Sequence, residues 1–297
     1  MYSSNEKGAI VNPNIAVLLA AYNGIEWVQE QIDSILDQIN VNVDIYISVD
    51  YSNDGTYEIC KSYANKKKSI HVLPYGDKFG GAAKNFFRLI KDVNIQEYDF
   101  IAFSDQDDIW DKRKLSRAVQ SITKYSLSAV SSDVVAFWYN GKEKYIKKSW
   151  PQKTYDYLFE SAGPGSTYVF KEEAMTNFKR FLSQNWSEIN NISFHDWLIY
   201  AYFRKEKLKW HIDNYPMLRY RQHLRNEAGA NYGIQAYLNR IFLFKNKWYR
   251  KEVEKINSVL DTGISLNAQF IIKNFWQLRR NPRDAIVLLL MTIFMIY

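Results

Sequence analysis

The sequence predicts an α/β protein built on a mostly parallel sheet. In the first half of the chain, short apolar runs alternate with stretches whose apolar residues recur every three or four positions. Strands that alternate with helices in this way form parallel sheets with right-handed crossovers. The composition agrees, because 47% of the 297 residues are hydrophobic and 24% are charged. That is enough for a large packed core and gives no sign of general disorder.

The first elements are read directly from apolar spacing. Residues 15–21 (IAVLLAA) form an uninterrupted apolar run, which predicts a buried strand that ends at the turn formers of residues 22–24 (YNG). Apolar residues at spacings of three and four across residues 25–39 predict an amphipathic helix. Residues 43–49 (VDIYISV) predict the next strand, and residues 50–55 (DYSNDG) form a loop rich in turn residues.

The same rhythm continues to about residue 103. Helical spacing returns in residues 56–64, and a third strand is expected at residues 69–73. A helix is expected to continue through residues 85–90 after the glycines at 80–81. Residues 98–103 predict a fourth strand, which stops at an acidic cluster.

Polar or acidic loops follow three of these strands, after Ala21, Val49 and Phe103. Ligands bind beyond the carboxyl ends of parallel strands, so we expect the three loops to converge on one crevice. The third loop, residues 104–110 (SDQDDIW), has three carboxylates within four residues, which repel one another unless a positive charge neutralises them. Such a cluster suits a hard divalent cation and its diphosphate ligand. An acidic turn in solvent is the alternative.

The second half of the chain has weaker periodicity. A strand is expected at residues 131–137, and the glycines and proline of residues 163–165 predict a loop before residues 166–170. Helices are expected at residues 196–204 and across residues 234–260.

The C-terminal segment is the most apolar part of the chain. Residues 285–297 are thirteen residues with a single polar member, Thr292. A spanning helix needs about 20 apolar residues, so this segment is too short to cross a bilayer alone. It follows a basic stretch, since residues 240–283 contain ten Lys or Arg against three acids. We therefore expect an interfacial membrane anchor, with a buried core helix as the alternative.

Charge and cysteine content narrow the partners and the compartment. The formal charge is +7, but no zinc-ligand spacing or RNA-binding motif accompanies it, so no nucleic-acid partner is expected. Cys60 is the single cysteine, which excludes an intrachain disulfide and fits a reducing compartment. The first residues lack the pattern of a signal peptide, and we expect a cytoplasmic protein.

Seven short segments between about residues 14 and 232 match a known protein family, and they occur in the same order as in that family. The chain resembles family 2 glycosyltransferases of the GT-A fold, and most of all the rhamnosyltransferase-type members that build O-antigen and capsule chains. The matching segments are residues 20–24 (AAYNG), 30–35 (EQIDSI), 48–56 (SVDYSNDGT), 80–86 (GGAAKNF), 105–110 (DQDDIW), 194–197 (FHDW) and 220–223 (YRQH).

The resemblance implies a donor site and a metal site. Asp50 would accept a hydrogen bond from a pyrimidine N–H, and Asp107 would be the direct ligand of Mg²⁺ or Mn²⁺. His223 would complete the metal shell, bind diphosphate or only pack, and Arg221 is an alternative diphosphate contact. The full set implied for the donor is Ala21, Tyr22, Asn23, Asp50, Lys84, Asp105 and Arg221.

The resemblance also implies a catalytic base and an acceptor side. Asp196 corresponds to the base, and the chemistry agrees, because an inverting transfer needs a carboxylate to take the proton of the acceptor hydroxyl. A simple helix cap is the alternative for this residue. The residues implied on the acceptor side are Gly163, Gly165, His195 and Trp197.

The expected function is inverting transfer of L-rhamnose from dTDP-rhamnose to a lipid-linked glycan in surface polysaccharide synthesis. The alternatives are a UDP-hexose or UDP-N-acetylhexosamine transferase of the same fold, a non-catalytic nucleotide-sugar-binding protein, or a membrane scaffold. Residues 1–232 would form the GT-A domain, and residues 233–297 a basic helical region that associates with the membrane. The protein is expected to be peripheral, at the cytoplasmic face of the inner membrane.

Overall fold

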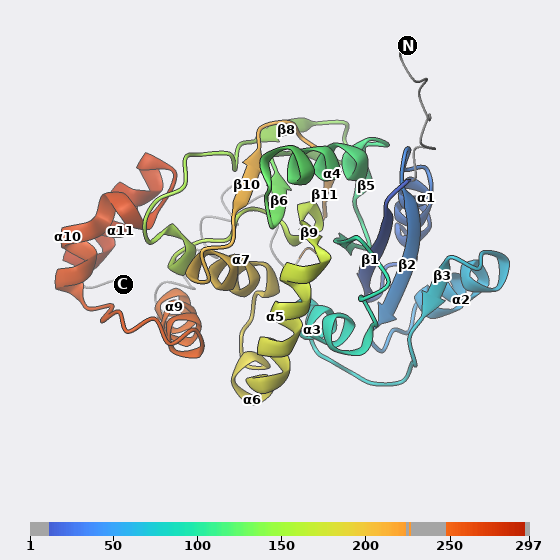
Figure 1. Cartoon of the computed structure of the whole chain (residues 1–297), viewed down its shortest axis with the longest axis horizontal. Coiled ribbons are helices and arrows are strands. Elements are labelled where there is room, and N and C mark those ends of the chain that lie inside the picture. The colour runs from blue at the N-terminus through green and yellow to red at the C-terminus, as the bar shows by residue number, and fades with distance from the viewer. Residues whose placement is uncertain (1–11, 224–225, 227–247, 295–297) are drawn as a thin grey trace, which may run out of the picture.

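A computed structural model describes residues 12–223, 226 and 248–294. In this part of the chain the main sheet has seven strands in the order β10-β6-β9-β4-β1-β2-β3, and only β9 runs against its neighbours. The predicted α/β class and its mostly parallel sheet are confirmed (Figure 1). The strands are β1 (Asn14–Ala21), β2 (Asn42–Val49), β3 (Ile70–Val72), β4 (Phe100–Asp105), β6 (Ala129–Ser132), β9 (Val169–Lys171) and β10 (Trp210–Asp213).

The central strand β1 is apolar from residue 15 to residue 21 because both of its faces are buried. Ile15, Val17 and Leu19 pack into the core on one face of the sheet. Ala16 and Leu18 pack into a second core on the other face. Helices cover both faces, so neither side of this strand meets water.

The helices of the first half lie where the apolar spacing predicts them. They are α1 (Val28–Leu36), α2 (Thr56–Lys66) and α3 (Ala82–Asp92). The first is shorter than predicted. It follows a turn in which Trp27 and Val28 both donate their N–H to the carbonyl of Gly24 at 2.9 Å, and it stops before Ile39, whose N–H donates outside the helix to the carbonyl of Lys112 at 3.1 Å.

The predicted single strand at residues 131–137 is wrong. The chain forms β6 and then β7 (Val134–Trp138), which belong to different sheets and are separated by Asp133. The Asp133 carboxylate is fully buried and accepts hydrogen bonds from the backbone N–H and the hydroxyl of Ser149, each at 2.7 Å. A buried carboxylate needs such donors. Asp133 and its partners therefore fix the point at which the chain passes from the first sheet to the second.

The second sheet of the described residues has the strand order β5-β11-β7-β8. Its remaining strands are β5 (Ile109–Trp110), β8 (Glu143–Ile146) and β11 (Leu218–Gln222). Because β5 directly follows the acidic turn and β11 runs beside it, this sheet brings residues near position 220 back to the end of β4.

Further helices complete the two layers around the main sheet. They are α4 (Lys114–Tyr125), α5 (Glu172–Gln184), α6 (Trp186–Ile189) and α7 (His195–Lys205), with 3-10 turns η1 (Asp156–Leu158) and η2 (Gly165–Thr167). The helix predicted at residues 196–204 is confirmed as α7. The loop at residues 163–165 leads into η2 and then β9.

The C-terminal helices pack on the same core as α3, α5 and α7. They are α9 (Trp248–Val259), α10 (Ala268–Leu278) and α11 (Pro282–Ile293). Val253, Ile256 and Ile271 are fully buried in that core. These helices lie at the opposite end of the molecule from β2 and β3 (Figure 1). The helix predicted at residues 234–260 is confirmed over α9, and its first part, like the domain boundary at 232, lies outside the described residues.

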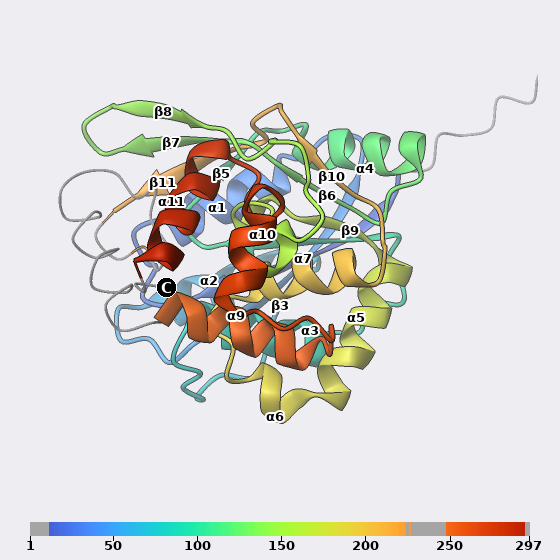
Figure 2. The same cartoon turned by 90° about the vertical axis from the view of Figure 1, so that its left-hand side faces the viewer.

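The apolar C-terminal segment forms α11, which lies beside α10 at the surface (Figure 2). Ala285 and Leu288 are buried, whereas Val287, Leu290 and Phe294 are 51%, 47% and 69% exposed. One face of the helix therefore packs on the protein while another presents apolar side chains. Within the described residues, no helix has the length and apolar character needed to cross a bilayer.

Candidate active site

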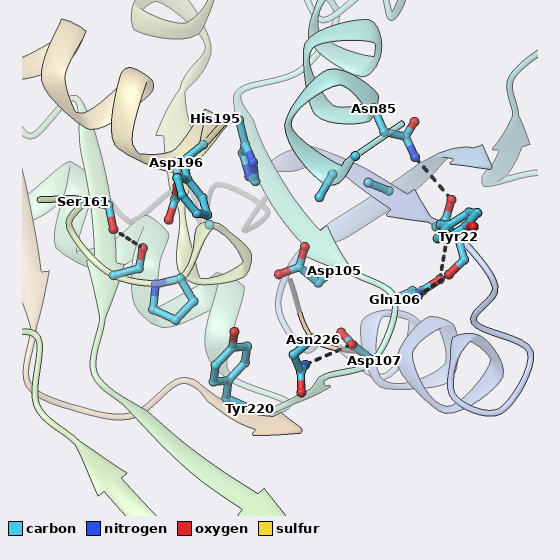
Figure 3. Close-up of a pocket in the computed structure, with 18 of the residues that line it drawn as sticks. Tyr22, Asn85, Asp105, Gln106, Asp107, Ser161, His195, Asp196, Tyr220 and Asn226 are labelled. Atoms are coloured by element: carbon cyan, nitrogen blue, oxygen red, sulfur yellow. Dashed lines mark hydrogen bonds between the residues drawn. The ribbon is translucent and has the colours of Figure 1, made fainter. Parts of the chain in front are cut away.

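The loops after β1, β2 and β4 converge on one cleft of about 1210 Å³, as the parallel topology predicts. Figure 3 shows the labelled side chains on its two sides, with Asp105 between them. Ten of the predicted site residues line this cleft. They are Ala21, Tyr22, Asn23, Asp50, Asp105, Asp107, Gly163, Gly165, His195 and Asp196.

The loop after β1 is fastened to the acidic turn by Gln106. Its side-chain oxygen accepts from the backbone N–H of Tyr22, and its side-chain nitrogen donates to the Tyr22 carbonyl, both at 2.8 Å (Figure 3). A Cβ at Gly24 would lie only 2.0 Å from the Gln106 Oε1 atom, so glycine is the residue that fits there. The two loops therefore hold one fixed arrangement on the donor side.

The carboxylate of Asp50 organises a second loop on this side. Its Oδ1 atom accepts from the backbone N–H groups of Tyr51 and Phe79, and Oδ2 accepts from Gly80, all at 2.8–2.9 Å. The side chain is 3% exposed and lines the cleft. Asp50 thus ties the loop before α3 to the end of β2, and its contact with a nucleotide base stays a prediction.

Asp107 is paired with His223, although the two are far apart in sequence. Their Oδ2 and Nε2 atoms are 2.7 Å apart, and Asn226 Nδ2 lies 3.5 Å from the same oxygen. The His223 ring stacks on Trp27 with centroids 3.9 Å apart. Arg221 donates from Nε to the Asp107 carbonyl at 2.8 Å. The turn is therefore held by side chains from β11 and the residues that follow it.

The third acid of the cluster, Asp108, points away from the cleft into the protein. It is fully buried and accepts from the Ser166 hydroxyl at 2.7 Å. Burial, and then the neighbouring Asp107 charge, raise its pKa well above the usual range. Burial lowers the pKa of Lys114, whose ammonium acts on Asp108 and lies 3.5 Å from the centre of the Trp110 ring. A raised pKa favours the neutral, protonated form of Asp108, and this reduces the repulsion expected among the three carboxylates.

The donor set around Asp107 fits a small divalent cation. A carboxylate oxygen and an imidazole nitrogen are already side by side, and diphosphate oxygens would supply the remaining ligands. Among the residues that the structure describes, no group of three or more His, Cys, Asp or Glu side chains comes together to hold a metal.

Asp196 lies in the first turn of α7, facing the same cleft as Asp105 (Figure 3). Its Oδ1 atom accepts from the backbone N–H of the adjacent Trp197 at 2.8 Å. The N-cap of α7 is Phe194, so the simple helix cap considered for Asp196 is not what the structure shows. Burial raises the pKa of the Asp196 carboxyl to about 6. A carboxylate of this pKa is a stronger base than an exposed one and is still ionised at neutral pH.

The imidazole of His195 is held in its neutral form. Burial lowers its pKa to about 3, and its ring stacks on Phe86 with centroids 4.0 Å apart. In the described part of the chain its Nε2 atom has no hydrogen-bond partner. A Cβ at Gly165 would lie 2.5 Å from this atom. The glycine thus leaves space for a buried polar group beside Asp196.

Four predicted residues are not among those that line the cleft: Lys84, Trp197, Arg221 and His223. The Trp197 indole donates to the carbonyl of Tyr157 at 3.0 Å and stacks on Tyr249 inside the protein. On α3 it is Ala82 and Asn85, not Lys84, that line the cleft.

Several contacts that build the site carry no signal in the sequence. Arg221 forms an ion pair with Glu30 and donates to the Asp107 carbonyl, so its guanidinium braces the turn; its contact with diphosphate stays a prediction. Gln106 lies between Asp105 and Asp107 in the sequence, and its two bonds to the Tyr22 backbone could not be read from that position. The pairing of Glu30 with Arg221 joins positions 191 residues apart, and only the fold reveals such a contact.

Fold and site together define an α/β protein with one large cleft at the carboxyl ends of its parallel strands, lined by several carboxylates. Residues 16–210 match the model of glycosyl transferase family 2, and the chain belongs to this family of glycosyltransferases. It is 42% identical to the dTDP-rhamnosyl transferase RfbG of Shigella flexneri over 94% of this chain and 100% of that protein.

Solved structures agree on the fold. The mannosyltransferase PcManGT from Pyrobaculum calidifontis, solved with GDP-Man and Mn²⁺, matches with a TM-score of 0.53 at 14% identity, over 96% of this chain and 86% of that one. Residues 1–349 of S. aureus TarS, solved with UDP-GlcNAc, match with a TM-score of 0.54 at 16% identity, over 90% and 74% of the two chains. The predicted GT-A architecture is therefore confirmed.

Proposed function

We propose that this protein transfers L-rhamnose from dTDP-rhamnose to a lipid-linked glycan during surface polysaccharide synthesis. The observation that carries the proposal is the 42% identity to a dTDP-rhamnosyl transferase, over 94% of this chain and all of that protein. The cleft supports it, because Asp107, which is paired with His223, and the base Asp196 border one continuous space large enough for a nucleotide sugar and an acceptor.

The donor occupies the part of the cleft built by β1, β2 and the acidic turn. The Tyr22 ring is 51% exposed there, and its backbone is fixed by Gln106, so the ring is positioned to pack on the thymine or the deoxyribose. Asp107 and His223 would hold a Mg²⁺ or Mn²⁺ ion. When bound, the ion neutralises the charge that develops on the leaving dTDP.

Asp196 performs the proton transfer. Its carboxylate takes the proton of the acceptor hydroxyl as that oxygen attacks the anomeric carbon, and the bond from this carbon to the diphosphate oxygen breaks. A single displacement of this kind inverts the anomeric configuration. The neutral imidazole of His195 can donate or accept one hydrogen bond, which orients the acceptor sugar beside the base.

The enzyme works at the cytoplasmic face of the membrane, with α10 and α11 resting on the lipid. Ile286, Val287, Leu290 and Phe294 form an exposed apolar stripe along α11, and Arg283 stands at its head with the same helical spacing. Arginine beside apolar side chains suits an interfacial helix on anionic lipid. Asp284 of the same helix also lines the cleft. With α11 on the membrane surface, a lipid-linked acceptor is therefore brought to the site.

A donor panel tests the proposed activity. The purified chain is heated with dTDP-rhamnose, dTDP-glucose, UDP-glucose or UDP-GlcNAc, each with Mn²⁺ or with EDTA, and the unfolding temperature is recorded. Ligands that bind only the folded state raise it by mass action. We expect the largest, Mn²⁺-dependent rise with dTDP-rhamnose. A larger rise with a UDP-sugar would replace rhamnose by that donor, and no rise with any of them would count against catalysis.

A further inference from the structure

The short link between α10 and α11 is bonded to the segment that leads into the cleft wall. The backbone N–H of Arg280 donates to the Glu160 carboxylate, and the Arg280 guanidinium donates to the Ser161 carbonyl. The neighbouring Arg279 donates to the Phe159 carbonyl at 2.7 Å. Two consecutive arginines therefore hold three consecutive residues of this segment.

Ser161 begins the acceptor loop, residues 161–165, which lies against the proposed base. The Ser161 hydroxyl donates to the Gly163 carbonyl at 3.1 Å, and Ser161 and Asp196 lie on the same side of the cleft (Figure 3). At the end of the loop, a Cβ at Gly165 would lie 3.4 Å from the Asp196 Cβ atom. A shift of this loop would therefore displace the groups that surround the base.

The same guanidinium also reaches the helix that carries the base. Arg280 forms an ion pair at 3.0 Å with Asp156, whose carboxylate is fully buried. Asp156 also accepts from the Tyr200 hydroxyl at 2.8 Å and from Arg204 at 3.0 Å, and both of these residues belong to α7. Asp196 lies in the first turn of that helix. One arginine, only 3% exposed, therefore joins the acceptor loop to the helix of the base.

We propose that Arg280 is a positioning residue for glycosyl transfer, and that it sets the acceptor loop against Asp196. The inference rests on the proposed function, since it takes Asp196 as the base. Arginine suits this role because its planar fork directs N–H groups at two partners, the Asp156 carboxylate and the Ser161 carbonyl, in fixed directions. The family match ends at residue 210, so the C-terminal helices supply this contribution from outside the matched part of the chain.

The Ser161 hydroxyl makes this positioning measurable. Burial raises the pKa of Asp196 to about 6, whereas hydrogen bonds from the Trp197 N–H and from the Ser161 hydroxyl act in the opposite direction. The other titratable groups around Asp196 are Lys148, Tyr168, His195 and Tyr220. The variant Arg280→Lys keeps a positive charge near these groups, so a shift in the pKa of Asp196 in this variant reports the geometry of the loop.

The test compares the full-length wild type with Arg280→Lys, with Ser161→Ala and with the control Arg180→Gln. Arg180 is an exposed arginine of α5 that bonds at 3.2 Å to Asn177 of its own helix. Calorimetry with dTDP and Mn²⁺ counts the folded binding sites in each sample. Transfer from dTDP-rhamnose to lipid-linked glycans, extracted from cells that lack this enzyme, is then measured per binding site from pH 5 to 8.

We expect Arg280→Lys to lower kcat per binding site roughly tenfold and to leave KM for dTDP-rhamnose unchanged, because the donor side of the cleft keeps its contacts. The acid limb of the pH profile should move upward by roughly half a unit or more, both in this variant and in Ser161→Ala. Arg180→Gln should match the wild type. If Arg280→Lys does not fold, Asp156→Asn replaces it with the same expected results, since it removes the charge of the partner and keeps an oxygen.

A wild-type kcat in Arg280→Lys overturns the assignment, because a positive charge alone would then suffice. So does a lower kcat with an unmoved pH profile, which indicates a purely structural role. An unmoved profile in Ser161→Ala removes the link between the loop and the base. If the wild type transfers rhamnose and the variants behave like it, this inference fails alone, whereas a wild type that transfers no rhamnose refutes the proposed function.

Discussion

Replacing Asp196 by asparagine should abolish transfer and, at the same time, stabilise the protein. Asparagine keeps an oxygen for the Trp197 N–H that bonds to Asp196 at 2.8 Å, but it cannot take a proton. The rise in the pKa of Asp196 from the ordinary 3.8 to about 6 means that the folded state disfavours the ionised carboxylate. At neutral pH this corresponds to at most about 3 kcal/mol of lost stability.

The sign of the pH dependence follows from the same shift. The folded pKa is above the unfolded one, so the penalty is complete above pH 6 and disappears as the pH falls to 3.8. At pH 7.5 the Asp196→Asn variant should therefore melt several degrees above the wild type, and the gap should close toward pH 4. In the wild type, kcat/KM should fall about tenfold per pH unit below pH 6.

The assays are release of dTDP from dTDP-rhamnose and thermal unfolding monitored from pH 4 to 8. Glu206→Gln, at the exposed end of the same helix, is the matched control and should change neither quantity. Turnover retained by Asp196→Asn would refute the role of this residue as base. A variant that melts below the wild type at pH 7.5 would show that the charge is stabilising and that the burial reasoning is wrong.

Three further substitutions test other parts of the site. Gly165→Ala places a methyl group 2.5 Å from Nε2 of His195, and should lower kcat about 100-fold while dTDP affinity, measured by calorimetry, stays the same. Gln106→Ala removes two bonds to the Tyr22 backbone and should raise KM for the donor about tenfold; an unchanged KM contradicts the bracing role. Leu290→Glu should reduce co-sedimentation with anionic vesicles but leave turnover on a soluble acceptor intact, and undiminished sedimentation would exclude this face.

The sheet was predictable because its strands carry their own signal. The run at residues 15–21 is apolar throughout, since both faces of β1 are covered, and the loops after three parallel strands must meet at one edge. The failure at residues 131–137 has a local cause. Asp133 looks like a polar position in an edge strand, and nothing nearby reveals that its carboxylate is buried and turns the chain between two sheets.

Site residues close to a strand end were easier to find than their partners. The acids at 105–108 follow β4 directly, but the sequence could not say that Asp108 turns inward while Asp107 pairs with His223. Arg221 looked like a phosphate ligand because of its chemistry. Its contacts with Glu30 and with the Asp107 carbonyl could not be foreseen, because they depend on pairing between distant strands, and its contact with diphosphate stays a prediction.

The most direct measurement is transfer itself. Purified protein is incubated with dTDP-rhamnose, Mn²⁺ and lipid-linked glycans extracted from cells that lack this enzyme. The masses of the products are then measured by mass spectrometry. Rhamnosyl transfer predicts a lipid-linked product heavier by one deoxyhexose, formed by the wild type and not by Asp196→Asn. A product formed only from a UDP-sugar, or equal product from the variant, would contradict the proposed reaction.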